Sequence, residues 1–467
     1  MSADMPASIM WFRQDLRLAD NPALLAAAAE GPVLPVFILD DGAAGRWAYG
    51  GAQRWWLHHS LAALAQGLAG LGAPLVLLRG DAARLIPELA ERVGAGSVHA
   101  ARLYEPWARR RDEAIHRALS AQGRALVLHP GVLLHEPHRL RTREGRAYGV
   151  YTPFARALFA LGEPPPPLPA PTALRPLSDA PPGMALEALG LLDPRGWWRG
   201  FHDRWEPGEG GAARRLDRFG AGGIAAYASR RNLPGLPGTS GLSPHLRWGE
   251  ISPRQLWHAA RALGAAGEHP FLKEILWREF SYHLLWHRPE LPEAPLQPAF
   301  ARFPWVRDPA LLRAWQRGRT GYPIVDAGMR ELWQTGWMHN RVRMIAASFL
   351  VKHLLQPWQD GAAWFWDTLV DGDLASNSAS WQWVAGCGAD AAPYVRIFNP
   401  ILQGEKFDPE GAYVRRFLPE LAELPLRFLH RPWEAPSPPR GYPAPIIGHA
   451  EGRARALAAY ASLKTAA

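Results

Sequence analysis

The chain has 467 residues, of which 48% are hydrophobic and 20% are charged. This length exceeds that of an ordinary single core and predicts two or three domains, while the composition excludes a disordered protein. The 52 Lys and Arg residues outnumber the 43 Asp and Glu residues, for a formal net charge of +9. Such an excess suits a polyanionic partner and equally suits simple solubility, so charge alone does not choose between them.

Several classes of protein are excluded by what the chain lacks. Cys387 is the only cysteine, which excludes an intrachain disulfide, a four-cysteine zinc site and an iron–sulfur cluster. The N-terminal residues lack the basic segment and apolar run of a secretory signal, and no apolar run approaches the roughly 18 residues that span a bilayer. We therefore expect a cytoplasmic, monomeric protein without a metal site or membrane contact.

The first 130 residues alternate between short apolar runs and amphipathic stretches. The runs with the length and composition of buried strands are 8–12, 33–39, 74–78, 97–102 and 125–130. Strand and helix alternation at this spacing predicts a doubly wound, five-stranded parallel sheet, and we place an α/β domain at 1–135. No Gly-x-Gly-x-x-Gly motif follows the first strand, so a dinucleotide site of the common kind is not supported.

A proline-dense segment follows, and the pattern then changes from strands to helices. Residues 163–182 hold too many prolines for a regular helix or a central strand, which indicates an extended connection. We expect a linker at 136–204 and a larger all-helical domain at 205–467. Within that domain, apolar residues recur at helical spacing in 251–263, 271–286 and 341–355.

Tryptophans cluster in the second half of the chain. Eleven of the 22 lie between Trp277 and Trp383. Core filling explains any single one of them but explains the clustering less well. Tryptophan offers a large stacking surface and an easily oxidised ring, so the cluster suits an aromatic ligand or an electron relay.

Two predicted helices carry residues suited to a polar pocket. Glu274, Trp277 and Arg278 lie at i, i+3 and i+4 and so share a face. A second helix repeats this spacing with Trp337, Asn340, Arg341 and Met344. An aromatic, amide and carboxylate lining suits a planar, hydrogen-bonding base. A packed helix pair with a buried ion pair explains the same pattern, and spacing alone favours that interpretation.

Two polar loops could hold a phosphate-bearing ligand. One contains Thr239, Ser240, Gly241 and Ser243, and the other contains Asp371, Asp373 and Asn377. Loops of small residues can present backbone N–H groups to an anion, although such loops are common. The two aspartates have no further cluster of acids or histidines nearby, which argues against a metal site.

Long strings of the chain resemble the photolyase/cryptochrome family, and most closely the cyclobutane pyrimidine dimer (CPD) photolyases. The strings are WFRQDLRLADNPAL, GTSGLSPHLRWGEISP, WREFSYHLL, GRTGYPIVDAGMRELWQTGWMHNRVRM, DGDLASNSASWQW and DAAPYVRIFNPILQGEKFD. The resemblance spans nearly the whole chain. It implies an α/β domain followed by a helical FAD-binding domain. It also implies a lyase that repairs pyrimidine dimers in ultraviolet-damaged DNA with reduced FAD and blue or near-ultraviolet light.

The resemblance further implies roles for single residues. FAD would be held by Tyr227, Thr239, Ser240, Leu242, Ser243, Trp337, Arg343, Asp371, Asp373 and Asn377. Asn377 would face flavin N5, where plant-type photoreceptors carry an acid, so its neutral amide favours repair over signalling. The dimer would contact Glu274, Trp277, Asn340, Met344 and Trp383, with Arg341 and Arg396 on DNA phosphates. A relay to the flavin would run through Trp381, Trp358 and Trp305.

Some alternatives stay open. Glu105 lies in a region that often contributes, in this family, to a second light-harvesting chromophore, a folate or a deazaflavin. The sequence does not decide which one binds, or whether one does. A cryptochrome-like blue-light receptor without repair activity is the main rival function, and Asn377, the dimer-pocket residues and the short C-terminal tail argue against it. A cofactor-free nucleic-acid-binding protein and a nucleotide-binding transferase are two further rivals.

Overall fold

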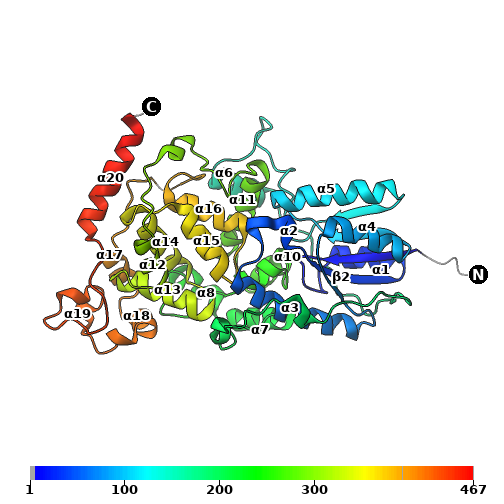
Figure 1. The fold of residues 1–467 in the computed structure, drawn as a ribbon, viewed down its shortest axis with the longest axis horizontal. Coiled ribbons are helices and arrows are strands. Elements are labelled where there is room, and N and C mark those ends of the chain that lie inside the picture. The colour runs from blue at the N-terminus through cyan, green and yellow to red at the C-terminus, as the bar shows by residue number, and fades with distance from the viewer. Residues whose placement is uncertain (1–5, 392, 466–467) are drawn as a thin grey trace, which may run out of the picture.

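The computed structural model describes residues 6–391 and 393–465. A sheet near the N-terminus adjoins a larger body of helices (Figure 1). Its strands pair in parallel in the order β3-β2-β1-β4-β5, which confirms the predicted doubly wound sheet. The strands are β1 Ala7–Phe12, β2 Val33–Leu39, β3 Val76–Arg79, β4 Ala95–Ala101 and β5 Ala125–His129.

The central strands are apolar along their length because helices cover both faces of the sheet. On one face, Met10 and Phe37 pack with residues of α1 and α3, and on the other face Trp11 and Val36 pack with residues of α4 and α5. Asn21 starts the first helix by accepting a hydrogen bond from the backbone N–H of Leu24 at 3.1 Å. The helices of this part are α1 Pro22–Glu30, α2 Asp41–Ala44, α3 Gly51–Gly70, α4 Ala82–Arg92 and α5 Pro106–Ala121.

The proline-dense connection lies against the α/β part. Residues 163–182 contain no helix, and an isolated bridge pairs Pro176 with Val33. Backbone hydrogen bonds of 2.9 Å from Asp20 N to Leu168 O and from Leu174 N to Leu71 O hold it there. The helix α6 Tyr151–Ala160 precedes the connection and contacts α11. The limits 1–135, 136–204 and 205–467 remain our proposed division.

The rest of the described chain is helical, in agreement with the periodicity of its sequence. It begins with α7 Glu209–Gly220, α8 Gly223–Arg230, α9 Ser243–Trp248, α10 Pro253–Ala262, α11 Pro270–His287, α12 Pro309–Gln316 and α13 Pro323–Thr335. It continues with α14 Asn340–Ser348, α15 Trp358–Thr368, α16 Leu374–Ala385, α17 Pro400–Phe407, α18 Ala412–Phe417, α19 Leu426–Leu429 and α20 His449–Thr465.

One predicted helix is divided. The sequence predicts a single helix over 341–355, whereas α14 passes into a π-helix at Phe349–His353. All five residues of the π-helix are buried, Lys352 included. The extra residue per turn changes the direction of the following side chains, and such segments are frequent at functional sites. Apolar spacing does not distinguish the two kinds of turn.

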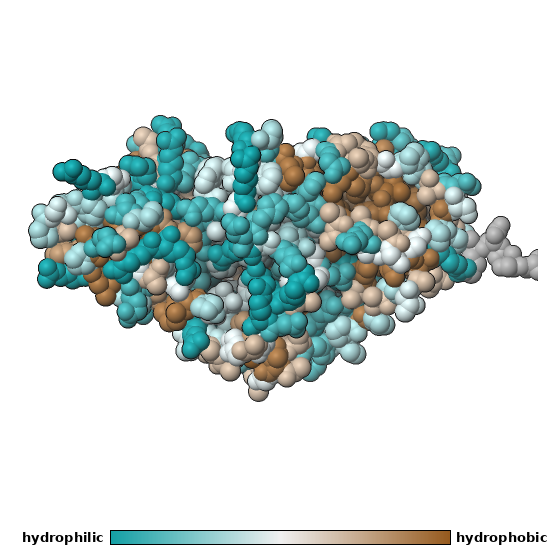
Figure 2. Space-filling model, turned by 90° about the horizontal axis from the view of Figure 1, so that it is seen from below, coloured by the Kyte–Doolittle hydropathy of each residue, from teal (hydrophilic) through white to brown (hydrophobic). Residues whose placement is uncertain are grey.

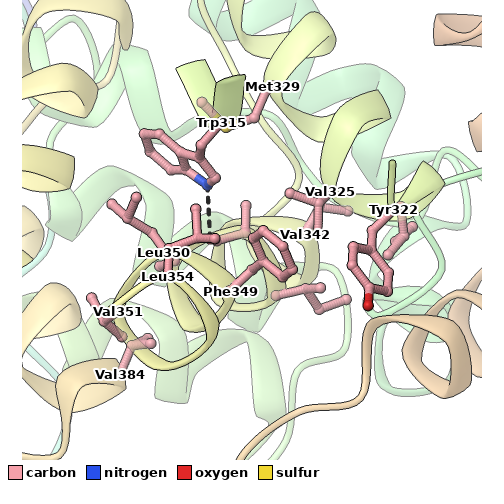
Figure 3. Packing of buried hydrophobic residues seen from close by; sticks show 14 of the residues in the cluster. Trp315, Tyr322, Val325, Met329, Val342, Phe349, Leu350, Val351, Leu354 and Val384 are labelled. Carbon is pink, nitrogen blue, oxygen red and sulfur yellow. Dashed lines mark hydrogen bonds between the residues drawn. The ribbon is translucent and has the colours of Figure 1, made fainter. Parts of the chain in front are cut away.

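A hydrophobic cluster of the helical body surrounds this segment (Figure 3). Phe349, Leu350, Val351 and Leu354 pack with residues of the neighbouring helices. Trp315 lies above them, and its indole N–H donates to the carbonyl of Ala346 at 2.9 Å. The cluster therefore fixes α14, which carries several of the predicted site residues.

The two parts of the molecule are joined through α3, which contacts α15. Gln53 Nε2 donates to the carbonyl of Trp366 at 2.6 Å, and the backbone N–H of Gly51 donates to Asp367 Oδ1 at 2.8 Å. Figure 2 shows the underside of the molecule, where hydrophilic side chains project over the helical half and hydrophobic residues are more frequent over the α/β half. The half of this face formed by the helical body is therefore the more hydrophilic half.

Candidate functional site

The loop 239–243 and the segment before α16 meet around the carboxylate of Asp371. Asp371 Oδ2 accepts hydrogen bonds from Ser243 Oγ at 2.6 Å and from Arg343 Nη2 at 2.8 Å. The indole N–H of Trp337 donates to Ser243 Oγ at 3.2 Å. These hydrogen bonds connect four predicted residues that lie far apart or several residues apart in the sequence: Ser243, Trp337, Arg343 and Asp371.

Asp373 positions the start of α16. Its Oδ1 accepts from the backbone N–H of Ser376 at 2.7 Å as an N-cap. Its Oδ2 accepts from the hydroxyl of Tyr282 on α11, and burial, followed by the negative charge of Asp373, raises the pKa of that tyrosine. One turn further, Asn377 Nδ2 donates to the carbonyl of Ala362 at 3.0 Å. These contacts fix where the buried amide of Asn377 lies.

The donors of this region fit a flavin dinucleotide. Loop 239–243 offers the half-buried hydroxyls of Thr239 and Ser240, and Tyr227 is buried on α8. Hydroxyl, indole N–H and guanidinium groups are the donors that bind a diphosphate, while buried carboxylate and amide groups suit ribose and ring edges. The predicted residues therefore provide the chemistry that FAD needs.

The predicted dimer pocket begins with a stack of two rings. Trp277 on α11 lies parallel to Tyr151 on α6, with ring centroids 3.5 Å apart and an interplanar angle of 4°. The Tyr151 hydroxyl donates to the carbonyl of Lys273 at 2.9 Å, which holds the tyrosine against α11. Tyr151 covers one face of the indole and is a residue that the sequence analysis missed.

Glu274 lies one helical turn before Trp277 and is paired with Arg231. The Arg231 Nη1 to Glu274 Oε1 distance is 2.5 Å. Burial raises the pKa of Glu274, and the attraction of Arg231 opposes that rise. Arg231 was also missed, and the pair of arginines that ends α8, Arg230 and Arg231, is the sequence signal that could have found it.

The other predicted dimer contacts lie on α14 and α16. Asn340 is the exposed first residue of α14, and Met344 is half-buried one turn later. Trp383 is half-buried on α16, six residues after Asn377. All three are accessible to a ligand to some degree, as a site for an extruded base requires.

Three arginines, Arg231, Arg341 and Arg396, lie near one another in this region. Arg341 Nη2 donates to Asn232 Oδ1 at 2.8 Å, and its guanidinium lies 4.6 Å from the ring centroid of Phe407. Burial, followed by repulsion from Arg231 and Arg396, lowers the pKa of Arg341. The predicted phosphate anchors Arg341 and Arg396 therefore lie near each other and near Arg231, which concentrates positive charge at one place.

The first two predicted relay residues are buried, and the last is partly exposed. Trp381 and Trp358 are 2% and 1% exposed, and Trp305 is half-buried. Trp381 on α16 contacts Phe365 of α15, with ring centroids 5.0 Å apart. A buried start and a partly exposed end are what a path from the interior to the surface needs, and the relay itself stays a prediction.

Glu105 lies apart from these residues, in the α/β part. It is 3% exposed and accepts a hydrogen bond from Gln14 Nε2 at 2.7 Å. A cleft opens nearby at the carboxyl ends of the parallel strands, the usual place for a ligand in such sheets. Its lining includes Trp11, Arg13, Asp40, Trp47, Trp107 and Arg111, and does not include Glu105.

In the part of the chain that the structure describes, there is no candidate metal site, membrane-spanning helix or reactive thiol. Over 6–391 and 393–465, no group of three or more His, Cys, Asp or Glu residues could hold a metal ion. No helix in these ranges combines the length and apolar character needed to cross a bilayer. Cys387 is buried, and burial raises the pKa of its thiol to about 12, so it is not a reactive thiolate at neutral pH.

Comparison with known proteins agrees with this geometry. Residues 8–172 match the family model for DNA photolyase, and residues 271–462 match that for the FAD binding domain of DNA photolyase. A deoxyribodipyrimidine photo-lyase of Agrobacterium fabrum is 51% identical over 479 residues, with 99% of each chain covered. The chain belongs to the DNA photolyase family.

Two further relatives of the chain are a class III photolyase and a plant cryptochrome. A crystal structure of a bacterial class III photolyase from Agrobacterium tumefaciens is 50% identical, with a TM-score of 0.96 over 100% of this chain and 99% of the other. Cryptochrome-1 of Arabidopsis thaliana is 38% identical over 96% of this chain and 69% of its own. The expected FAD-binding domain is thereby confirmed, and the roles of single residues remain predictions.

Proposed function

We propose that this protein is a deoxyribodipyrimidine photolyase of the class III type, which repairs CPDs in DNA under blue or near-ultraviolet light. Reduced FAD, when bound, supplies the electron that splits the cyclobutane ring and accepts it back, so the reaction has no net redox change. The observation that carries the proposal is the Trp277–Tyr151 stack beside the Arg231–Glu274 pair.

Trp277 provides the stacking surface for the dimer. Because Tyr151 covers one indole face at 3.5 Å, the ring is held rigidly and its second face can receive the extruded dimer. A CPD is already poorly stacked in the duplex, so its extrusion costs less than that of an intact pair. Trp383, Asn340 and Met344 complete the pocket and select the lesion.

Glu274 acts as a switchable hydrogen-bond donor. Arg231, 2.5 Å away, favours the charged carboxylate in the free protein. A DNA phosphate that draws Arg231 away removes the attraction that opposes the burial effect, so the pKa of Glu274 rises. In its protonated form, Glu274 donates to a pyrimidine carbonyl and stabilises negative charge that develops there.

The groups around Asp371 orient the cofactor. Ser243, Trp337 and Arg343 bind its polar part, and the hydrogen bonds that fix Asp371 keep these donors in place. Asn377 has no ionisable proton to transfer to flavin N5, which favours an electron-rich, anionic ring. Burial of the site excludes water from the reacting atoms.

We also propose that the cleft at the carboxyl ends of β1, β2 and β4 holds a light-harvesting folate or deazaflavin. Its lining includes the partly exposed indoles of Trp47 and Trp107, while the buried guanidinium groups of Arg13 and Arg111 are paired with Asp112. Aromatic surfaces suit a planar chromophore. Absorbance and chromatography of the released chromophores test this, because Trp107→Ala should lose the second chromophore and keep FAD.

A cryptochrome-like receptor is the second candidate, because Cryptochrome-1 is 38% identical over 96% of this chain. The test mixes chemically reduced protein with an oligonucleotide that carries one thymine dimer, and follows restored thymine by chromatography. Restoration under blue light, with none in the dark, supports the photolyase. A flavin-containing, photoreducible protein that leaves the dimer intact supports the receptor.

A further inference from the structure

Arg215 is a half-buried guanidinium on α7 without an anionic partner. Its Nη2 donates to the carbonyl of Arg204 at 2.7 Å, and its Cζ lies 4.5 Å from the ring centroid of Trp205. Across 6–391 and 393–465, no carboxylate forms an ion pair with it. Removing a charge from water without pairing it is unfavourable, so this position is built for an anion that the chain itself does not supply.

The surrounding charges strengthen that conclusion. Burial, followed by repulsion from Arg218 and Arg204, lowers the pKa of Arg215 to about 10. Glu206 attracts Arg215 only weakly and is itself paired with Arg214. Arg204 has its own partner, Glu331, at 3.0 Å. Arg218 is exposed to water, so Arg215 is the half-buried member of this group without a carboxylate in an ion pair.

The guanidinium of Arg215 lies against the loop 239–243. Gly241 has a φ of +64°, and a Cβ at this position would lie 2.6 Å from Arg215 Nη1. The left-handed backbone conformation favours glycine, and the short distance shows that the guanidinium of Arg215 lies directly beside the loop. The same loop carries Ser240 and Ser243, and Ser243 accepts from Trp337, whose ring lies 6.2 Å from that of Trp205.

We propose that Arg215 is a counter-ion of the FAD diphosphate, which lies between its guanidinium and the loop 239–243. The proposal rests on the proposed binding of the FAD phosphates by this loop. A diphosphate carries two negative charges, and a guanidinium binds such oxygens through short, charge-assisted hydrogen bonds. Loop 239–243 adds hydroxyl and backbone N–H donors on the other side. FAD binding then compensates the charge of this half-buried arginine.

The test measures release of FAD from the purified holoprotein, followed by the rise in flavin fluorescence. Arg215→Gln removes the charge, and Arg218→Gln is the matched control because Arg218 is exposed and one turn away on the same helix. We expect release from Arg215→Gln to be about tenfold faster or more, with a weaker dependence on chloride concentration than in the wild type. Arg218→Gln should release FAD at the wild-type rate.

Equal release rates for Arg215→Gln and Arg218→Gln, in a wild type that holds FAD and repairs dimers, overturn the role of Arg215 alone. A wild type that neither retains FAD nor binds added FAD overturns the proposed cofactor site as well. If Arg215→Gln does not fold, Arg215→Lys tests the role of Arg215 instead, because lysine keeps the positive charge and changes the hydrogen-bonding geometry. Phosphorus NMR of its FAD should show displaced diphosphate signals, and signals unchanged from the wild type overturn the proposal.

Discussion

Trp277 has one indole face covered by Tyr151, with ring centroids 3.5 Å apart, and we assign the other face to the dimer. Stacking of a base on an aromatic ring is worth about 1–3 kcal/mol. Trp277→Ala should therefore weaken binding of dimer-containing DNA by roughly 5- to 150-fold, since 1.4 kcal/mol is a factor of about ten. Trp277→Phe should retain much of the affinity.

Fluorescence anisotropy in the dark checks this, with an undamaged oligonucleotide of the same sequence as the control. The undamaged DNA should bind the variant and the wild type alike, because it contacts the arginines and not the pocket. An equal loss of affinity on both oligonucleotides would contradict the assigned role of Trp277.

The buried ammonium group of Lys352 should make the stability of the protein depend on pH. It is 2% exposed, its ammonium donates to the carbonyl of Arg396 at 2.9 Å, and burial, followed by repulsion from Arg396, lowers its pKa from 10.5 to about 8. Between pH 8 and 10.5 the unfolded chain binds more protons than the folded one, so stability rises with pH through this window. Below pH 8 the charged lysine costs about 3 kcal/mol.

Lys352→Met keeps the size of the side chain and removes this cost. The variant should exceed the wild type in free energy of unfolding by up to about 3 kcal/mol below pH 8, and the difference should shrink toward pH 10.5. Urea denaturation at a series of pH values measures it. A difference that is the same at pH 7 and pH 10 would show that the charge of Lys352 is not its source.

At the scale of elements, α15 and α16 approach closely at Gly361. A Cβ there would overlap the indole ring of Trp381, so Gly361→Ala must displace the first residue of the predicted relay. We expect slower photoreduction of the flavin and a loss of about 1–3 kcal/mol in the free energy of unfolding. Gly70→Ala, at the end of α3 where nothing lies within 4 Å, is the matched control.

Absorbance of the oxidised flavin under blue light with an electron donor follows the photoreduction. Trp381→Phe should slow it further, because the ring that donates to the flavin is then lost. The relay assignment is wrong if Trp381→Phe and Gly361→Ala are both reduced as fast as the wild type.

The elements themselves follow from sequence pattern, and their contacts do not. Apolar runs predict the parallel strands, since helices on both faces bury them. Spacing also places Glu274 and Trp277 on one helix face. Their partners Arg231 and Tyr151 come from the end of α8 and from the start of α6, and no local pattern indicates such pairing. The uncompensated charge of Arg215 likewise becomes visible only in the folded chain.

Glu105 shows a limit of reasoning from family position. Its place before α5 suggests a chromophore contact, yet its carboxylate is occupied by Gln14 Nε2 at 2.7 Å. The side chains that line the neighbouring cleft, such as Trp47 and Arg111, come from other elements. The order of the parallel strands predicts that a cleft lies at their carboxyl ends. Which residues line the cleft depends on how the side chains pack, and the sequence does not show this.

At the scale of the whole molecule, the formal net charge of +9 suits a polyanionic partner, and Arg231, Arg341 and Arg396 lie near one another. The slope of log affinity against log salt is negative, and each phosphate contact makes it steeper by about 0.7–0.9. Arg341→Gln should reduce the magnitude of that slope by one such step. It should weaken binding of damaged and undamaged DNA by the same factor.

Salt titrations of both oligonucleotides measure the slopes. Arg84→Gln is the control, since Arg84 is an exposed residue of α4 paired with Glu88 at 2.8 Å, in the α/β part. A slope for Arg341→Gln equal to that of the wild type and of Arg84→Gln would place the phosphate contact elsewhere.

The central claim is that light absorbed by this protein repairs a CPD held against Trp277 and Glu274. The most direct measurement is a single-turnover assay, in which reduced protein in excess over an oligonucleotide with one thymine dimer receives single blue flashes. The account predicts that each flash restores a fraction of the thymines, with none restored in the dark. Protein that absorbs the flashes and binds the oligonucleotide, yet leaves every dimer intact, would contradict it.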